Sequence, residues 1–500
     1  MAGLLKKVPE TVLVLLAGYF LLNIVVRLAM PTSLELDEAQ QALLSQWLAA
    51  GYDPQPPFYN WVQYYVVALL GPSVFALSLL KNALLFLSYA AYFLAARTVL
   101  KNRDLAIIAT LGLLTIPQIA FEAQRDLSHT VAVIFAATLF LYGFFRTLAA
   151  PTAFSYLLTG AAIGIGMISK YNFALLPAAA LIAILPDREM RSRLLDWRIL
   201  LTAAVALVIV APHALWLVDH LDLASKRTME KLTEEGGSRL AQITTGVMSL
   251  LVAVIGFGAL TVVLFAVAFG KQLFASLKAG NRWTVLIERI FLVFVAALVL
   301  LILFAGASHI KDRWLTPLLL ILPLYLCLKI EAAGGIKETA LRRFLPIPLA
   351  IMVLIPTVLA GRVVSAGWVG DYEKLNVPYQ AFADEVVGKN PVQPAAIIAA
   401  DQHLAGNLRS QLPGIPVLTP IYPDFRPSVE WSDKAPLLLV WRNFGKANAP
   451  MPPALAKEIA RRDGAAVGAL EVKEIALPYI YGSGQDTYSF AYAWVYPPQK

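Results

Sequence analysis

Long apolar segments separated by short polar loops occupy the first 361 residues of this 500-residue chain. Eleven of them predict membrane-spanning helices, at residues 11–30, 74–96, 105–120, 127–145, 155–169, 172–186, 199–218, 245–269, 287–307, 314–329 and 344–361. The shorter ones fall below the ~20 residues that cross a bilayer, so they require tilt, a thin bilayer or a broken helix. An odd number of spans places the two ends of this region on opposite sides of the membrane.

The pattern changes after residue 361. Short apolar runs predict strands, and helical spacing lies between them. The strands are predicted at 395–399, 415–418, 437–441, 467–475 and 487–495, and the helices at 379–388, 401–411 and 453–463. The sequence therefore predicts an α-helical polytopic membrane protein with about 11 transmembrane helices. Its predicted domains are a membrane module over 1–361, with a first outer loop at 31–73, and a soluble α/β domain over 362–500.

Composition supports this class. Hydrophobic residues make up 58% of the chain and charged residues only 15%, against about 25% charged in a soluble protein. The net charge of +8 predicts contact with the lipid bilayer and no nucleic-acid partner, because Lys and Arg gather at the ends of the apolar segments. Cys327 is the single cysteine, so the chain forms no internal disulfide and the compartment has to be inferred from topology.

Basic residues in the short loops predict the orientation. Seventeen lie on the side of the N-terminus and eight on the opposite side, which places the N-terminus in the cytoplasm and the domain after residue 361 outside. The apolar segment after Lys6 and Lys7 lacks a small-residue cleavage site. It is therefore interpreted as a retained first span.

The first outer loop carries an acidic pair, Asp37 and Glu38, at the start of a helical pattern over residues 38–50. Its apolar face predicts a helix on the membrane surface, with Leu43, Leu44, Trp47 and Leu48 on that face. The alternative is purely structural: Asp37 as N-cap and Gln40 at the third helical position would form a capping box.

Two further outer features carry polar chemistry. The run from Gln55 to Trp61 (QPPFYNW) predicts a rigid extended turn with aromatic side chains at the interface. Between the third and fourth spans lie Glu122, Arg125, Asp126 and His129. Charged groups at a membrane boundary are costly and usually face a cavity or a partner. Alternatively, Arg125 and Asp126 anchor a helix end, with Asp126 as an N-cap.

Several cations lie where an anionic lipid could be bound. Lys81 falls within the second span, Lys170 ends the fifth, and His309, Lys311 and Arg313 separate two later spans. Each has a structural alternative, namely snorkelling of Lys81, a boundary charge at Lys170 and a solvated loop at 308–313. The loop 219–244 carries both signs of charge and a Gly236-Gly237 pair, and it is interpreted as surface rather than as part of a site.

Taken together, the acidic pair, the Pro56-Pro57-Phe58 run and Asp126 resemble the GT-C glycosyltransferases, in the group of the protein O-mannosyltransferases and the lipid A aminoarabinose transferases. The resemblance covers about residues 10–330, and its most specific part, 36–61, is similar to bacterial lipopolysaccharide-core galacturonosyltransferases. It implies an inner-membrane enzyme with a periplasmic active site and C-terminal domain, a polyprenyl-phosphate-linked sugar donor and a glycolipid acceptor, lipopolysaccharide or lipid A. Asp37 matches the catalytic acidic residue of the first loop, and Asp126 the second acidic position.

The chemistry of such a transfer accounts for these residue types. A base must deprotonate the acceptor hydroxyl, and cations must hold the departing phosphate. Asp37 is the expected base. The expected substrate-binding residues are Glu38, Gln55, Tyr59, Lys81, Arg125, Lys170, His309, Lys311 and Arg313. Several relatives have His or Lys at the position of Gln55, so phosphate binding here depends more on the other cations.

Some alternatives stay open at this point. A divalent cation could be held by Asp37, Glu38 and Asp126, although no dense ligand motif is present and no cofactor is certain. The sugar could be galacturonic acid or another uronic, amino or pentose sugar. A transporter or a flippase-associated subunit would also have many spans, although neither needs a long outer tail. A protein O-glycosyltransferase is the second alternative.

Overall fold

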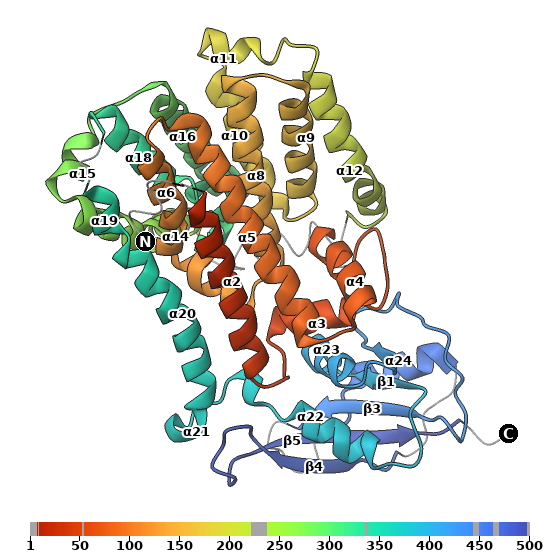
Figure 1. Cartoon of the computed structure of the whole chain (residues 1–500). Coiled ribbons are helices and arrows are strands. Elements are labelled where there is room, and N and C mark those ends of the chain that lie inside the picture. Colours follow the sequence, from red (N-terminus) through yellow and green to blue (C-terminus); the bar gives the residue numbers. More distant parts are fainter. Residues whose placement is uncertain are drawn as a thin grey trace. The chain divides into compact units, whose positions relative to one another are not determined.

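The computed structural model describes residues 8, 10–52, 55–221, 238–335, 339–443, 450–463 and 470–497. The chain divides into two compact units (Figure 1). The helical unit comprises 1–21, 50–59 and 81–355, and the C-terminal unit comprises 22–49, 60–80 and 356–500. Most of the predicted loop 219–244, with Lys226, Arg227, Lys231 and the Gly236-Gly237 pair, lies outside the described residues.

Among the described residues, seven helical segments are long and apolar enough to cross a membrane. They are α2 (Thr11–Ala29), α5 (Val74–Val99), α8 (His129–Ala149), α12 (Ile199–Asp219), α14 (Arg239–Phe269), α16 (Arg282–Ala305) and the pair α19 (Ala340–Phe344) and α20 (Pro346–Val364). All eleven predicted spans contain helix. The count of eleven crossings stays a prediction, because α9 (Ala153–Met167), α10 (Leu175–Ile184) and α18 (Leu322–Ala332) have only 15, 10 and 11 residues.

The third predicted span is broken. Helix α6 (Arg103–Gly112) continues through a 3₁₀ turn, η1 (Leu113–Thr115), and the chain then bends by 73° before η2 (Gln118–Glu122) and α7 (Ala123–Asp126). Pro117 stands at the bend, where its ring excludes a helical conformation for Ile116 and its nitrogen donates no hydrogen bond. Segment η2 is a π-helix, a form that is often found at functional sites. The predicted span over 105–120 is therefore a broken helix, one of the three possibilities that its short length left open.

Two sequence predictions need correction. The run after Gln55 is not an extended turn, because α4 (Phe58–Leu70) begins directly after the two prolines. The helix predicted over 38–50 is shorter and begins earlier, as α3 (Leu36–Leu44). The remaining short elements of the helical unit are η3 (Tyr171–Ala174), α11 (Arg188–Ser192), α15 (Lys271–Ser276), η4 (Asp312–Trp314) and α17 (Thr316–Leu319).

Small residues allow close packing of α8, α9 and α12 in the helical unit. A Cβ on Gly143 would lie 2.8 Å from the Thr159 hydroxyl, and one on Gly160 would lie 2.5 Å from the Thr202 carbonyl oxygen. The Thr202 hydroxyl donates to the Tyr156 carbonyl across the same contact, at 2.8 Å. Such small-residue contacts let membrane helices approach closely and gain van der Waals contact.

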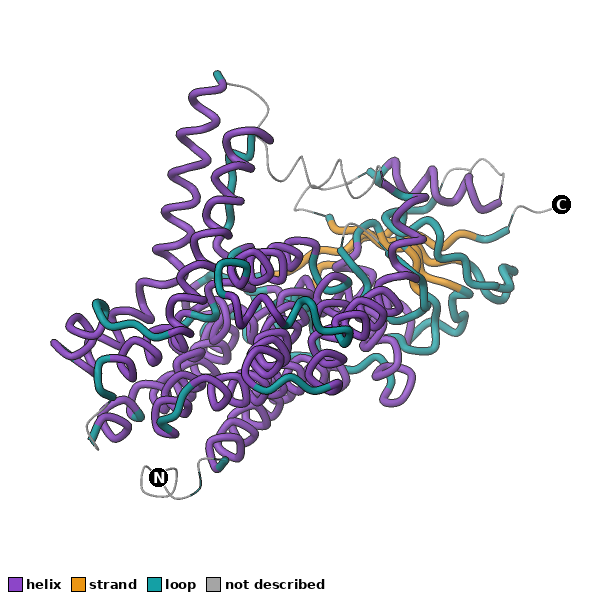
Figure 2. Tube along the Cα trace, turned by 90° about the horizontal axis from the view of Figure 1, so that it is seen from above, coloured by secondary structure: helices purple, strands orange, loops and turns teal. Residues whose placement is uncertain are grey.

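The C-terminal part folds as the predicted α/β structure, and its strands lie together (Figure 2). They form a five-stranded mixed sheet in the order β2-β1-β3-β5-β4. The strands are β1 (Ala396–Ala399), β2 (Val417–Leu418), β3 (Leu437–Arg442), β4 (Lys473–Pro478) and β5 (Thr487–Val495). Strands β2, β1 and β3 are parallel, and β5 pairs antiparallel with β3 and β4. The associated helices are α21 (Ala366–Val369), η5 (Lys374–Asn376), α22 (Tyr379–Ala383), η6 (Asp384–Gly388), α23 (Gln402–Gln411) and α24 (Pro453–Asp463).

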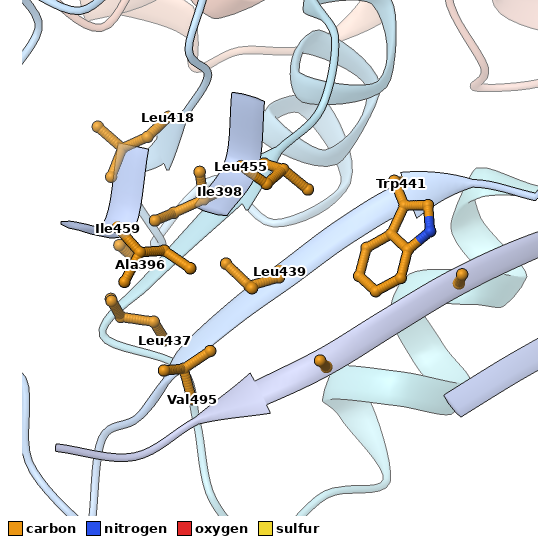
Figure 3. Packing of buried hydrophobic residues seen from close by; sticks show 11 residues of the cluster. Ala396, Ile398, Leu418, Leu437, Leu439, Trp441, Leu455, Ile459 and Val495 are labelled. Atoms are coloured by element: carbon orange, nitrogen blue, oxygen red, sulfur yellow. The ribbon is translucent and has the colours of Figure 1, made fainter. Parts of the chain in front are cut away.

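The core of this sheet lies on the face covered by α24. Leu455 and Ile459 of α24 pack on inward-facing residues of β1, β2, β3 and β5 (Figure 3). Trp441 belongs to the same cluster and is 1% exposed. Successive side chains of a strand point to opposite faces of a sheet, so every second residue of β1, β3 and β5 contributes to this face.

Candidate active site

The first turn of α3 presents the acidic pair of the first outer loop. Glu38 is buried and forms an ion pair with Arg27 of α2, with Arg27 Nη2 2.9 Å from Glu38 Oε2. Arg27 also donates to the carbonyls of Pro31 and Ser33 at 2.9 and 2.8 Å. This set of charge-assisted bonds shapes the turn that leads into α3.

The capping box exists, but it begins two residues earlier than predicted. Glu35 is the N-cap, and Glu38 at the third helical position accepts from the Glu35 N–H at 3.3 Å. Asp37 is therefore not the N-cap. It lies in the first turn of α3 and is half-buried.

Helix α3 packs on α23 of the same unit. On the loop before α3, the Leu34 N–H donates to Asn407 Oδ1 at 2.8 Å, and His403 Nε2 lies 2.8 Å from the Leu34 carbonyl oxygen. Beyond α3, Gln46 exchanges two hydrogen bonds with the backbone of Val417, at 2.8 and 2.9 Å. On the apolar face that predicted a surface helix, Leu43 and Leu44 are buried and Trp47 stacks on Phe425, whereas Leu48 is exposed. This face is therefore covered in large part by protein.

In the helical unit, the segment 118–130 after the bend contacts several of the predicted cations. Lys81 is buried in α5 and its ammonium donates to the Gln124 carbonyl at 3.2 Å. The Gln124 amide in turn donates to Asn82 Oδ1 at 3.1 Å. Lys81 thus points into the protein, which does not fit the snorkelling alternative.

The end of this segment carries a second set of contacts. The ammonium of Lys170, which precedes η3, donates to the Thr130 hydroxyl at 2.9 Å. Tyr59, 3% exposed at the start of α4, lies with its ring 6.3 Å from that of His129. The N–H of Phe58 donates to the Ile168 carbonyl at 2.8 Å. This hydrogen bond holds the Pro56-Pro57-Phe58 run beside the turn that carries Lys170.

The other predicted residues are placed as follows. Arg125 pairs with Glu122 at 2.8 Å and is 40% exposed. Asp126 is the last residue of α7, and Ser128 precedes α8, so Asp126 is not the N-cap of the fourth span. Gln55 is half-buried.

The segment 308–314 is tied to the same region. Gln118 donates to Asp312 Oδ2, and Asn172 donates to the Trp314 carbonyl at 2.7 Å. His309 is half-buried with Nδ1 3.3 Å from the Ser308 hydroxyl, and Lys311 is exposed. The side chain of Arg313 lies outside what the structure describes.

The structure thus brings some of the predicted site residues together around the segment 118–130. Tyr59, Lys81, Lys170 and the segment 308–314 all contact it. Asp37 and Glu38 belong to the other unit. In the described ranges no three His, Cys, Asp or Glu side chains converge in a way that could hold a metal ion. The described residues therefore give no geometric support to a bound divalent cation, which stays a prediction.

Sequence reasoning missed the residues that organise these positions. Arg27 could have been noticed as a basic residue in the last turn of an apolar span. Gln124 and Thr130, which accept hydrogen bonds from the two lysines, carry no signal in the sequence. The same holds for Asn407 and His403, which lie more than 360 residues from the loop that they contact.

The fold defines a class of membrane protein. Over 98% of this chain and 100% of the other, the structure matches that of ArnT from Cupriavidus metallidurans bound to undecaprenyl phosphate, with a TM-score of 0.59 and 15% identity. Residues 54–216 match the dolichyl-phosphate-mannose-protein mannosyltransferase family. The predicted GT-C fold of a multi-pass membrane protein is confirmed.

Two relatives narrow this class to a family. The chain is 54% identical to the lipopolysaccharide core galacturonosyltransferase RgtB of Rhizobium johnstonii (strain DSM 114642 / LMG 32736 / 3841) over 97% of both proteins. It is 48% identical to RgtA of the same strain over 98% of both. The protein belongs to the family of lipopolysaccharide core galacturonosyltransferases. Membership in this family favours the enzyme over the transporter and flippase-subunit alternatives.

Proposed function

We propose that the protein transfers a galacturonosyl residue from a polyprenyl-phosphate donor to the lipopolysaccharide core at the periplasmic face of a bacterial inner membrane. The observation that carries this proposal is the 54% identity to RgtB along almost the whole chain. In the reaction, the acceptor hydroxyl oxygen forms a bond to the anomeric carbon. The bond from that carbon to the phosphate oxygen breaks, and polyprenyl phosphate leaves.

Asp37 is the proposed base that takes the proton of the acceptor hydroxyl. Its half-buried position in the first turn of α3, within the stretch 36–61 that carries the family motif, supports this role. Glu38 next to it is already engaged by Arg27, so its proposed contact with substrate has to coexist with that pair. Asp126 is proposed as the second acidic residue of the site.

The donor phosphate is proposed to contact Lys81 and Lys170, with Arg125, His309, Lys311 and Arg313 as further cationic candidates and Gln55 and Tyr59 beside them. Positive charge and N–H donors around the leaving phosphate stabilise the charge that develops on it. The contacts of Lys81 and Lys170 with the segment 118–130 support this assignment. The undecaprenyl phosphate bound to ArnT is a lipid of the proposed carrier class.

The test uses the full chain purified in lipid nanodiscs, with polyprenyl-phosphate galacturonic acid as donor and lipopolysaccharide from cells lacking this protein as acceptor. Mass spectrometry measures the transferred sugar. Asp37→Asn keeps the size of the side chain and removes the base, so transfer should fall by about 100- to 10,000-fold. Asp371→Asn, at an exposed position of the same unit, is the matched control and should transfer normally.

The unfolding temperature of each variant separates loss of chemistry from loss of fold. Normal transfer by Asp37→Asn would return this residue to a structural role. Transfer to a protein substrate but not to lipopolysaccharide would replace the proposed acceptor and revive the O-glycosyltransferase alternative.

A further inference from the structure

A pocket of about 260 Å³ opens on the face of the sheet that carries the core of the C-terminal unit. Its floor consists of Ile398, Leu418 and Leu437, one residue from each parallel strand (Figure 3). Arg461 of α24 lines one side. The rest of the lining comes from the segment between β2 and β3, through Arg426, Pro427, Val429 and Trp431.

The two arginines are fixed by one backbone group. Arg426 Nε and Arg461 Nη2 donate to the Pro423 carbonyl oxygen, at 3.4 and 2.6 Å. Arg461 also lies 3.5 Å from the carboxylate of Glu458. A guanidinium has five N–H donors. Both terminal nitrogens of Arg426 and one of Arg461 have no partner among the residues that the structure describes, and both side chains are exposed.

Trp431 supplies an aromatic surface in the same pocket. Its indole N–H donates to the Val495 carbonyl at 2.9 Å, which fixes the ring against the sheet. Guanidinium groups bind carboxylate or phosphate with paired hydrogen bonds, and an aromatic face packs against the C–H groups of a sugar ring. A volume of about 260 Å³ suits one sugar ring, because pockets for drug-sized ligands begin at about 300 Å³.

The segment that lines the pocket also contacts the region of Asp37. Phe425, adjacent to Arg426, stacks on Trp47 with ring centroids 4.4 Å apart. The Tyr422 hydroxyl accepts from Gln40 of α3 at 2.8 Å, and Gln40 lies one helical turn after Asp37. A sugar bound beside Arg426 is therefore coupled through this segment to the helix that carries the proposed base.

We propose that this pocket binds an anionic sugar of the acceptor, a saccharide bearing a carboxylate or a phosphate, and that it positions the acceptor for transfer. The inference rests on the proposed function for the identity of the acceptor. The binding itself requires neither the donor nor turnover.

The experiment compares the full chain in nanodiscs of zwitterionic lipid with its Arg426→Ala/Arg461→Ala variant. The probe is deacylated lipopolysaccharide core oligosaccharide, and isothermal titration calorimetry measures its Kd. The variant should bind at least tenfold more weakly, because the charge-assisted bonds from both guanidinium groups are lost. In the transfer assay KM should rise by the same factor, with kcat unchanged at saturating acceptor.

The matched control is Lys457→Ala/Lys473→Ala. It removes the same charge from exposed positions of the same unit outside the pocket, and it should leave Kd unchanged. If this control lost as much binding of the probe at an unchanged unfolding temperature, the loss would come from net charge alone. That result would overturn the proposed site.

Two treated probes identify the anionic group. Loss of binding after dephosphorylation assigns phosphate, and loss after reduction of the carboxyl groups assigns carboxylate. The proposal would be overturned if both treated probes bound as tightly as the untreated probe, or if a neutral maltooligosaccharide did so. Binding of the untreated probe without any transfer would keep this site and reject the proposed function instead.

Discussion

His403 joins the C-terminal sheet to the first loop through a single neutral imidazole. Its Nε2 lies 2.8 Å from the Leu34 carbonyl oxygen, which can only accept, so this nitrogen carries the hydrogen. Its Nδ1 faces Arg442 Nη2 at 3.2 Å and the Tyr379 hydroxyl at 3.4 Å. Burial lowers the pKa of His403 to about 4, and the positive charge of Arg442 acts in the same direction. The hydrogen bond to the Leu34 carbonyl and the charge of Asp401 oppose this shift.

The stability of this contact should therefore depend on pH. An unfolded histidine has a pKa of about 6.5, so below that pH the unfolded chain binds the proton before the folded chain does. The stabilisation is complete above pH 6.5 and falls as pH drops toward 4, by up to about 3 kcal/mol. The positive charge of Lys374 also lowers the pKa of His403.

Denaturant unfolding of the wild type and of His403→Gln across pH 4–7 checks this expectation. The amide of Gln can still donate to Leu34 but does not titrate. The difference in unfolding free energy between the two proteins should change with pH in this window. Two parallel curves would show that His403 does not titrate on unfolding.

At the scale of elements, the contact between α3 and α23 holds in place the helix whose first turn carries Asp37. Gly406 of α23 faces Ala39 of α3, and a Cβ at this glycine would lie 1.8 Å from the Ala39 carbonyl oxygen. Since the obstructing atom is backbone, only movement of a helix could make room. Glycine at this position is therefore what permits the two helices to lie so close.

Gly406→Ala should separate α3 from α23 and destabilise the unit by about 1–3 kcal/mol, as overpacking of a close contact does. Under the proposed function, transfer should fall with it, because α3 carries the base. Unfolding temperature and transfer rate are measured side by side. Gly414→Ala is the matched control, since a Cβ there has no neighbour within 4 Å, and a normal Gly406→Ala protein would contradict the packing argument.

The broken span is the second feature of this scale. The bend at Pro117 turns what would be a uniform membrane helix into a segment whose backbone and side chains contact neighbouring elements. Gln118, Gln124 and Thr130 all bond to residues far along the chain. Irregular backbone at membrane depth is tolerated where it is buried in protein or lines a cavity, which fits a binding role for this segment.

For the whole molecule, the proposed topology places the N-terminus in the cytoplasm and the C-terminal sheet in the periplasm. A reporter that is active only outside the cytoplasm should work when fused after residue 361 and remain silent when fused near 190 or 275. The reason is the excess of Lys and Arg in the loops at 187–198 and 270–282. Activity at both ends of one span would contradict the topology, and a cytoplasmic reporter at the same sites provides the complementary control.

The apolar pattern alone determined the helices of the membrane part, the mixed α/β tail and most element boundaries. The strand at 487–495 and the helix at 453–463 were predicted to the residue, because alternation and helical spacing are local properties of the chain. The motif at 36–61 likewise indicated the family that the comparisons then established.

Only the tertiary structure decided which partner each polar residue meets. In it, Arg27 pairs with Glu38, the N-cap of α3 is Glu35 rather than Asp37, and Lys81 donates to the Gln124 carbonyl. It also fastened the first loop to α23 and collected Arg426, Trp431 and Arg461 around one pocket. Some of these contacts join residues several hundred positions apart in the chain. They depend on packing in three dimensions and not on local propensity, so the periodicity of the sequence does not predict them.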